Sequence, residues 1–356
     1  MKKLCLLLAI VLLATGSVFA EQSVLIDFTK LSPDADGQNT ATLMDFGATI
    51  GTGYTDAQKA LMKSSLAYEN WDVRFNPSAD RKENFGSSEV KAATSTVNGT
   101  VMGARIHFPV EPWDATANVV PPFDIPAFQS ATGESGAASA AGTSKFENGF
   151  GVIKNVQTVK QIQVNVYGLN FPHALYIVLK DSSNVEKEYF MGYLDFNGWR
   201  ALVWDNPAYI ENVKNRSLAL YPLYPQDTPY IKFVGFRVKR DASAIGGDFV
   251  AYFKDVSVIY DKAVETTTRD IDDEAIWGIQ TERENNNMKV EFQKLGSSTV
   301  LQEIEKEKQA TESFTTDTTG TAAGGGAAAP APAAGGAAAP APAAGGGAAA
   351  PAAPAQ

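Results

Sequence analysis

Alternation of polar and apolar residues with a period of two is the feature that most limits the folds open to this chain. In residues 161–166 the apolar side chains Ile162, Val164 and Val166 alternate with Gln and Asn, so they face one side of a strand. Such a strand belongs to a sheet with one face on a core and the other in solvent. The pattern therefore predicts antiparallel β-structure.

Further β-rich runs follow at short intervals, separated by turn residues such as those at 182–184. Strands without intervening helices favour an antiparallel sandwich over a βαβ fold. We therefore predict one all-β dominated domain over residues 21–262, held together by core burial alone because its only cysteine, Cys5, precedes it. The runs are 24–28, the apolar row Leu175, Ile177 and Leu179, residues 188–194, the row Val234, Phe236 and Val238, and residues 249–260.

The first twenty residues have the pattern of an export signal. Lys2 and Lys3 precede an apolar run from Leu4 to Leu13, and residues 18–20 place small side chains before Glu21. A membrane anchor is the alternative, but the apolar run is shorter than the about 20 residues that span a bilayer. We predict cleavage between Ala20 and Glu21, export to the periplasm, and no membrane insertion of the mature chain.

Two segments depart from the strand pattern. Thr55 is the N-cap of a short helix predicted over residues 55–68, with Leu61, Met62 and Leu66 as apolar positions. Residues 131–144 are rich in Ala, Ser, Gly and Thr and are predicted to form a mobile inserted loop.

The composition changes after the last predicted strand. Residues 263–320 form a polar extension with two short helices predicted, at 273–284 around the anchors Ile276, Trp277 and Ile279, and at 300–309. From 321 to 356 the chain is almost only Ala, Pro and Gly, with a ten-residue repeat. No side chain there is large enough to form a core, so a flexible, disordered tail is predicted.

The charge of the chain limits its partners. Without Lys2 and Lys3 the chain has 28 basic and 40 acidic residues, a net charge of −12. An acidic surface argues against nucleic acid and anionic lipid as partners.

Catalytic signatures are missing from the sequence. The two histidines, His107 and His173, are far apart in the chain and are expected to be isolated strand-edge residues, and no HExxH, GxSxG or Walker pattern occurs. Paired carboxylates for glycoside hydrolysis need no local motif, so Asp195, Asp205 and Glu211 stay open as candidates. Residues 270–274 are acidic but lack the ligand spacing of a calcium loop. We predict no enzyme activity, cofactor or metal.

Aromatic residues are dense between 189 and 225. Trp199 and Trp204 are five positions apart, so on one strand they point to opposite faces. If Tyr193 and Trp199 are cross-strand neighbours, Tyr193, Trp199 and Trp204 supply a surface aromatic platform for a sugar or another subunit. Packing of each ring in the core is the alternative.

Several ordered segments of the chain are similar to one protein family. They include residues 150–156, 166–173, 191–204, 215–218, 221–225, 246–250 and 254–263. In this order they resemble the spirochaete flagellar filament outer-layer (sheath) protein family, over most of residues 21–262. The Ala/Pro/Gly tail is outside the resemblance. Residues 252–258 also look like the closing strand of jelly-roll carbohydrate-binding modules, which implies a galactose-binding-like jelly roll.

The family resemblance implies a structural, non-catalytic subunit of the periplasmic flagellum. Its implied partners are flagellin core subunits, copies of itself and other sheath proteins, with possible glycan contacts, and its implied role is in filament stiffness, shape and motility. The alternative is a secreted jelly-roll carbohydrate-binding module or adhesin that uses the aromatic platform, and a glycoside hydrolase is a third hypothesis.

Overall fold

The computed structural model describes residues 20–31, 42–47, 53–60, 63–111, 114–128, 145–209, 228–263, 271, 273–287 and 289. These all belong to the first of two compact units, residues 1–311 and 312–356. The predictions for the signal segment before Ala20, the loop at 131–144, the helix at 300–309 and the tail at 321–356 lie outside the described residues.

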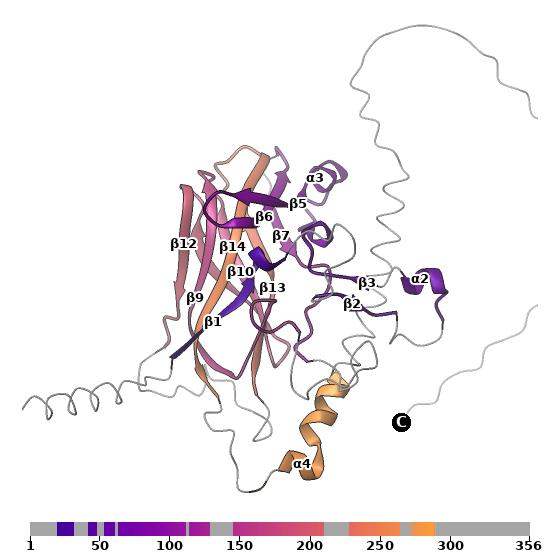
Figure 1. Ribbon diagram of the computed structural model, residues 1–356. Coiled ribbons are helices and arrows are strands. Elements are labelled where there is room, and N and C mark those ends of the chain that lie inside the picture. Colours follow the sequence, from indigo (N-terminus) through magenta and orange to yellow (C-terminus); the bar gives the residue numbers. More distant parts are fainter. Residues whose placement is uncertain are drawn as a thin grey trace, which may run out of the picture. The chain divides into compact units, whose positions relative to one another are not determined.

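Two six-stranded antiparallel sheets form the body of the protein (Figure 1). The first, sheet 1, has the order β12-β9-β14-β6-β5 with β1 beside β14, and the second, sheet 2, has the order β11-β10-β13-β7-β4 with β8 beside β13. Sheet 1 comprises β1 (Ala20–Asp27), β5 (Glu89–Ser95), β6 (Gly99–Phe108), β9 (Val156–Leu169), β12 (Asn197–Asp205) and β14 (Gly247–Lys262). Sheet 2 comprises β4 (Asp72–Phe75), β7 (Thr116–Val120), β8 (Val152–Lys154), β10 (Ala174–Asp181), β11 (Glu186–Tyr193) and β13 (Tyr230–Lys239).

The connections give this sandwich a jelly-roll topology. From β6 onward, the strands β6, β9, β12 and β14 belong to sheet 1, and the intervening β7, β10, β11 and β13 belong to sheet 2. Within the sheets these eight strands have the orders β12-β9-β14-β6 and β11-β10-β13-β7, the interleaved arrangement of two Greek keys. The predicted fold class is confirmed.

The core lies between the two sheets. Ile162, Val164 and Val166 of β9 face it from sheet 1, and the row from Leu175 to Leu179 of β10 faces it from sheet 2, as the alternation predicts. Phe236 of β13 and Phe253 of β14 join the sheets in a stacked pair with ring centroids 4.2 Å apart. Burial of such rings is the main stabilising contribution available to a sandwich without a disulfide.

One predicted apolar row is interrupted by a β-bulge. Val234 was predicted to share a face with Phe236 and Val238, but Val234 is only half-buried while Phe233 is fully buried. Val178 of β10 pairs with Gly235 and Leu179 pairs with Phe233, so Val234 is the extra residue of a bulge. Because a bulge changes the alternation by one position, the core-facing row becomes Phe233, Phe236 and Val238.

The helix predicted at 55–68 is shorter than expected. Only α2 (Asp56–Ala60) is helical, and Thr55 caps it as predicted. The Thr55 hydroxyl accepts a hydrogen bond from the Gln58 amide, and the Gln58 side chain accepts one from the Thr55 amide. The chain then enters the short strand β3 (Lys63–Ser64), which pairs with β2 (Met44–Asp45). Leu66 and Tyr68, in the predicted helical stretch, are instead fully buried in the core.

The other short helices lie at the margins of the sandwich. They are η1 (Phe28–Lys30), η2 (Tyr68–Asn70), α3 (Lys82–Gly86) and α4 (Asp273–Trp277). The strand expected at 24–28 ends at Asp27, whose side chain caps η1 by accepting the Thr29 amide. Among the described residues no helix is both long and apolar enough to span a bilayer.

Candidate binding surface

A row of three aromatic side chains crosses the outer face of sheet 1. Trp199 of β12 pairs directly with Tyr167 of β9, which pairs directly with Tyr252 of β14. The ring centroids are 5.5 Å apart between Trp199 and Tyr167, and 5.9 Å apart between Tyr167 and Tyr252, with edge-to-face geometry in both pairs. Each ring is half-buried. We call these three residues the aromatic row.

A glycine on the neighbouring strand makes room for the end of this row. Gly103 of β6 is the cross-strand partner of Tyr252. A Cβ atom at Gly103 would lie 3.1 Å from two carbon atoms of the Tyr252 ring. The ring therefore leans over β6, and a larger residue at 103 would displace it.

Side-chain amides and carboxylates surround the aromatic row on the same face. The Asn165 amide donates to Asp255 at 2.6 Å, and the Gln161 amide donates to Asp205 at 2.7 Å. Gln163 lies between Gln161 and Asn165 on β9, and its side chain has no hydrogen-bond partner among the described residues. The face therefore combines planar rings with amide and carboxylate hydrogen-bonding groups.

A charged cluster marks the far end of this face. Arg105 donates two hydrogen bonds to Asp248, at 3.2 and 2.9 Å, and Nδ1 of His107 lies 2.8 Å from the same carboxylate. The hydrogen bonds from Arg105 and His107 lower the pKa of Asp248, and the contact with Asp248 raises the pKa of Arg105. His107 is thus paired, contrary to the expectation of an isolated histidine.

The three residues of the predicted platform do not lie together. Trp199 is on the outer face of sheet 1 and Trp204 packs inward, with its ring 4.6 Å from that of Tyr189, so the opposite facing of the two is confirmed. Tyr193 belongs to sheet 2, where it pairs with Ala174, so Tyr193 and Trp199 are not the cross-strand neighbours that the platform requires. The chain crosses from one sheet to the other between them, which spacing along the sequence does not reveal.

Tyr193 instead joins a second exposed aromatic cluster. Phe190 contacts Tyr193 at 5.3 Å and Tyr176 at 5.2 Å between centroids, on the outer face of sheet 2. Beside them Arg237 forms an ion pair with Glu188 and donates to Asn118 at 2.7 Å. This cluster lies in a charged surrounding.

The other end of sheet 2's outer face is covered by residues 121–128. Asp124 from this segment contacts Lys232 at 2.9 Å and Lys180 at 3.3 Å, two cross-strand neighbours whose side chains are 1% and 13% exposed. Phe128 stands edge-on to Tyr230 at 5.2 Å, and the Lys154 ammonium lies 4.6 Å from the Phe128 ring centroid. This end of the face is therefore covered by the protein itself.

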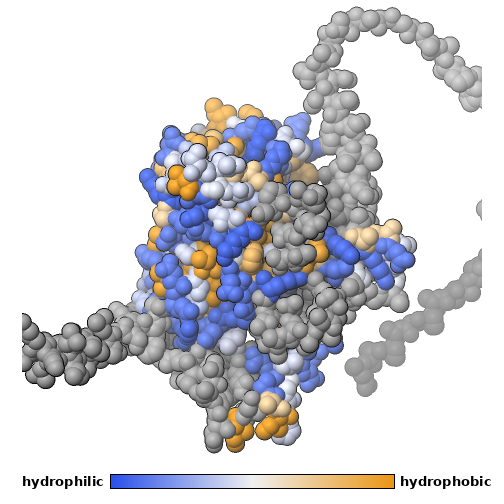
Figure 2. All heavy atoms as spheres, in the orientation of Figure 1, coloured by the Kyte–Doolittle hydropathy of each residue, from blue (hydrophilic) through white to orange (hydrophobic). Residues whose placement is uncertain are grey.

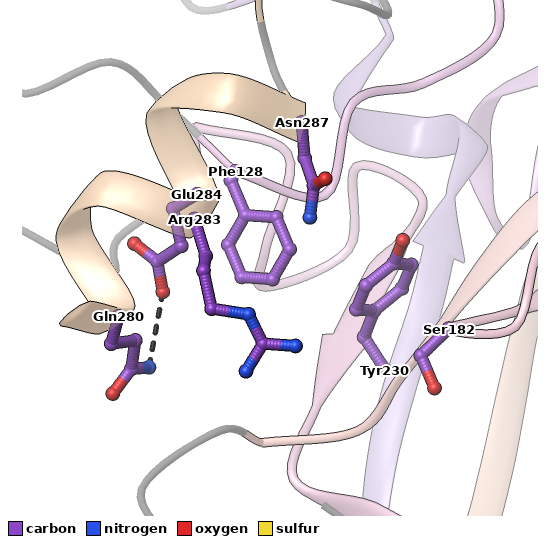
Figure 3. Close-up of a pocket in the computed structure, with 7 residues that line it drawn as sticks. All are labelled: Phe128, Ser182, Tyr230, Gln280, Arg283, Glu284 and Asn287. Atoms are coloured by element: carbon purple, nitrogen blue, oxygen red, sulfur yellow. Dashed lines mark hydrogen bonds between the residues drawn. The ribbon is translucent and has the colours of Figure 1, made fainter. Parts of the chain in front are cut away.

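The polar extension lies against the same end of sheet 2. Residues 279–287 are helical, and Figure 3 shows Arg283 reaching from this helix toward Tyr230 and Ser182 beside Phe128. The cavity between them measures about 90 Å³, well below the about 300–1,000 Å³ of small-molecule sites. It is a small gap where the helix packs against the sandwich.

The predicted anchors of this extension are exposed. The exposed fractions are 62% for Ile276, 72% for Trp277 and 38% for Ile279, so these apolar residues are not buried against the sandwich. Apolar residues gather at the lower end of the view in Figure 2. Gly278 has a φ of +58° and ends α4, and its amide donates a hydrogen bond to the Glu274 carbonyl at 2.8 Å. The helix therefore ends before Ile276, Trp277 and Ile279 can lie on one inward face.

The two histidines have separate environments. His173 is 5% exposed and lies among the rings of Phe108, Phe171 and Phe249. Burial lowers the pKa of His173 to about 4, although Asp241 opposes the shift. Among the described residues no group of three His, Cys, Asp or Glu side chains is arranged to hold a metal ion.

Comparison with known proteins identifies the family. Residues 35–269 match the model of the flagellar filament outer layer protein family. The chain belongs to this family. It is 45% identical to the flagellar filament outer layer protein of Treponema pallidum over 339 residues, which cover 88% of this chain and 95% of that protein. The corresponding protein of Spirochaeta aurantia is 42% identical over 311 residues, covering 85% of this chain and 92% of that protein.

The outer layer family therefore matches the resemblance carried by residues 150–263. The family is one of structural flagellar proteins, not an enzyme family. Among solved structures, a carbohydrate-binding module in complex with beta-1,4-galactotriose is similar with a TM-score of 0.26 and 9% identity, covering 55% of this chain and 90% of that one. A family 11 carbohydrate-binding module has the same TM-score and identity, covering 56% and 91%.

Sequence reasoning missed Tyr167 and Tyr252. The period-two pattern of β9 already places Tyr167 on the face opposite Val164 and Val166. What the pattern lacks is the order of strands, because Tyr167, Trp199 and Tyr252 come from three strands that pair only in the folded sheet.

Proposed function

We propose that this protein is a structural subunit of the flagellar outer layer that assembles around a flagellin core in the periplasm. In this role it binds flagellin, copies of itself and other sheath proteins, and contributes to filament stiffness, shape and motility. Its contribution is mechanical and non-catalytic.

The observation that carries this proposal is the near full-length similarity to outer layer proteins. An identity of 45% that covers 95% of the Treponema pallidum protein leaves no large part of that relative unmatched. A whole-length match supports a shared role in the assembly more strongly than a match to one module would.

The N-terminus of the sandwich is consistent with the predicted cleavage site. Strand β1 begins at Ala20, and Glu21 pairs with Tyr260 of β14 in the sheet and forms an ion pair with Lys262. Cleavage before Glu21 would leave the strand complete except for its first residue. Export of a chain trimmed there would therefore yield an intact sandwich.

The sandwich suits a load-bearing subunit. Its two sheets are joined by a continuous aromatic core that includes Phe28, Phe233, Phe236 and Phe253. Close-packed interiors have low compressibility, so such a body transmits force without changing shape. Many weak contacts repeated along a filament then give strong attachment without one tight site.

The edge strand β11 favours attachment through faces over strand addition. β11 lies at an edge of sheet 2 and begins with Glu186, Lys187 and Glu188, which are exposed. Charged residues on an edge strand oppose pairing with another chain.

The proposal is tested by mass spectrometry of detergent-stripped periplasmic flagella, run beside the soluble periplasmic fraction of the same cells. We expect strong enrichment of this chain in the flagella, with its first peptide beginning at Glu21. Finding the chain only in the soluble fraction or at the cell surface would reject the assembly role. A first peptide that begins elsewhere would reject the cleavage site alone.

A second measurement tests the mechanical role. Filaments from cells that lack this chain are compared with wild-type filaments by electron microscopy. We expect a thinner filament with altered curvature and a lower bending stiffness. Unchanged diameter and curvature would show that the chain is not part of the layer.

A further inference from the structure

We propose that the aromatic row of Trp199, Tyr167 and Tyr252 is a stacking site for the neutral sugar rings of a glycan. The proposal goes beyond the structural role and does not depend on it. Three observations support the proposal: the shape of the aromatic row, the hydrogen-bonding groups around it, and the pairing of the nearby cations.

The row has the shape of a site for a short saccharide. Its three residues are direct cross-strand partners on neighbouring strands, so they form one line perpendicular to the strands. Two strand spacings amount to about 10 Å, close to the length of a disaccharide. An aromatic face attracts the C–H side of a pyranose ring and also excludes water from it.

The polar groups of the row point to a ligand that carries hydroxyl groups. The Trp199 Nε1–H and the hydroxyls of Tyr167 and Tyr252 form no hydrogen bond within the described part of the chain. These groups are half-buried, so a ligand that covers the rings must replace the water bound to them. Sugar hydroxyls both donate and accept hydrogen bonds, whereas a purely apolar partner would leave these groups unsatisfied.

The amides beside the row extend this match. Gln163 has an unpaired side-chain amide among the described residues, and Asn165 uses one amide hydrogen on Asp255 at 2.6 Å. Amides and carboxylates next to a ring are suited to the vicinal hydroxyls of a sugar, because each presents donors or acceptors in one plane.

The charges on this face favour a neutral ligand over an acidic one. Three cations on this face near the row are held by carboxylates: Lys254 by Asp255 at 3.4 Å, Lys91 by Glu89 at 2.7 Å, and Arg105 by Asp248 at 2.9 Å. A phosphate or an acidic sugar would have to compete with these carboxylates and would meet the negative field of an acidic protein.

Two other exposed aromatic groups among the described residues fit a neutral sugar less well. The cluster of Phe190, Tyr193 and Tyr176 carries tyrosine hydroxyls, but it lies beside the charged side chains of Arg237 and Glu188, which pair with each other. Trp277 is accompanied by Ile276 and Ile279, which offer no hydrogen bonds.

The test is titration of the purified full-length mature chain with neutral oligosaccharides. The probes are cellotetraose, chitotetraose and β-1,4-galactotriose, with a tetramer of galacturonic acid as the acidic comparison, each up to about 10 mM by calorimetry. We expect saturable binding of at least one neutral probe and weaker binding of the acidic one. The Trp199→Ala variant should raise the dissociation constant about ten-fold or more.

Two further variants separate binding from folding. Trp199→Phe keeps a ring at the site and should lose less affinity than Trp199→Ala, whereas Tyr252→Phe removes only a hydroxyl and should weaken binding a few-fold. Phe190→Ala, which removes an exposed ring from sheet 2, is the matched control and should bind as the wild type does. Circular dichroism confirms that each variant is folded.

Either of two results would overturn the proposal: no saturable binding of any neutral probe, or equal binding by the wild type and Trp199→Ala. A third result assigns the face to a protein partner instead: Trp199→Ala leaves the sugar titration unchanged but no longer sediments with flagellar filaments. Absence of the wild-type chain from filaments rejects the structural role and does not alter the titration, so the two failures are distinguishable.

Discussion

The outer faces of the two sheets are built from the same period-two alternation, but they have different surfaces. On sheet 1 the outward positions of β9, β12 and β14 carry Tyr167, Trp199 and Tyr252 with amides around them, and the three rings are half-buried. On sheet 2 the outward Lys180 and Lys232 are neutralised by Asp124, whose segment covers them. The described part of sheet 1 thus presents rings and amides, whereas one end of sheet 2 is covered by the chain itself.

The difference shows that an outward position on a strand does not define a surface residue. Lys232 alternates outward from Phe233 in β13, yet its side chain is 1% exposed, because residues 121–128 pass over it. A buried lysine is tolerated only beside a carboxylate. The burial of charge on sheet 2 and the exposure of rings on sheet 1 therefore make opposite predictions for substitutions.

The largest effect is expected at Asp124. Asp124→Ala removes the carboxylate that contacts both Lys232 and Lys180, and breaking a buried ion pair costs about 3–5 kcal/mol of unfolding free energy. Urea denaturation measures it. The control is Asp248→Ala on sheet 1, which breaks an exposed pair and should cost much less. Equal losses in the two variants would contradict the contrast between the faces.

The next effect concerns His173, which lies between the sheets. Its pKa is lowered to about 4 by burial, whereas an unfolded histidine has a pKa near 6.5. Between these values the unfolded chain binds a proton and the folded chain does not, so stability falls as the pH falls from about 6.5 to about 4, by about 3 kcal/mol. Urea denaturation at several pH values measures this loss.

The control for this pH dependence is His173→Phe. This variant fills the same aromatic environment with a ring that does not titrate, so the decrease between pH 6.5 and pH 4 should shrink. A pH profile unaffected by His173→Phe would assign the decrease to other groups.

A smaller effect distinguishes the two tryptophans of β12. Trp204 packs inward against Tyr189, so Trp204→Ala should cost about 2–3 kcal/mol through loss of core packing. Trp199 lies in the aromatic row on the outside, so Trp199→Ala should cost about 0.5 kcal/mol, the contribution of a cross-strand pair. Thermal unfolding of both variants provides the comparison. A reversed order would mean that the faces of β12 are wrongly assigned.

The smallest effect is the pH dependence of the Arg105–Asp248 pair. The hydrogen bonds from Arg105 and His107 lower the pKa of Asp248 in the folded protein. The pair therefore contributes fully to folding stability above the unfolded pKa of about 3.9. This contribution is lost as the pH falls through the lower pKa of the folded state. The pair is exposed, so high salt should also weaken it. NMR titration of the Asp248 carboxyl carbon measures the pKa, and a value at or above 3.9 would contradict the lowering.

Much of the sandwich could be predicted from local pattern. The strands around Ile162–Val166 and Leu175–Leu179, the last strand from Phe249, and the opposite facing of Trp199 and Trp204 all follow from alternation. Predictions made from local helical periodicity were less accurate. Leu66 was predicted on a helix but is buried next to β3, and the apolar residues Ile276 and Trp277 of the predicted later helix are exposed.

The candidate site depended on information that local pattern does not contain. Trp199 was a correct choice of an outer aromatic, but its partners Tyr167 and Tyr252 lie 32 residues before it and 53 after it along the chain. Tyr193, only six residues from Trp199, belongs to the other sheet. Nearness in sequence was therefore a poor guide to nearness on the surface.

The sequence by itself indicated several of the strands and the apolar side of most of them, because alternation is a local property of neighbouring residues. Only the tertiary structure decided which strands lie side by side, where Val234 bulges, and which outward side chains stay in solvent. These are consequences of pairing between distant segments and of the loop that covers Lys232. The strand pairing and the covering loop are stabilised by contacts that exist only once the two sheets have packed together.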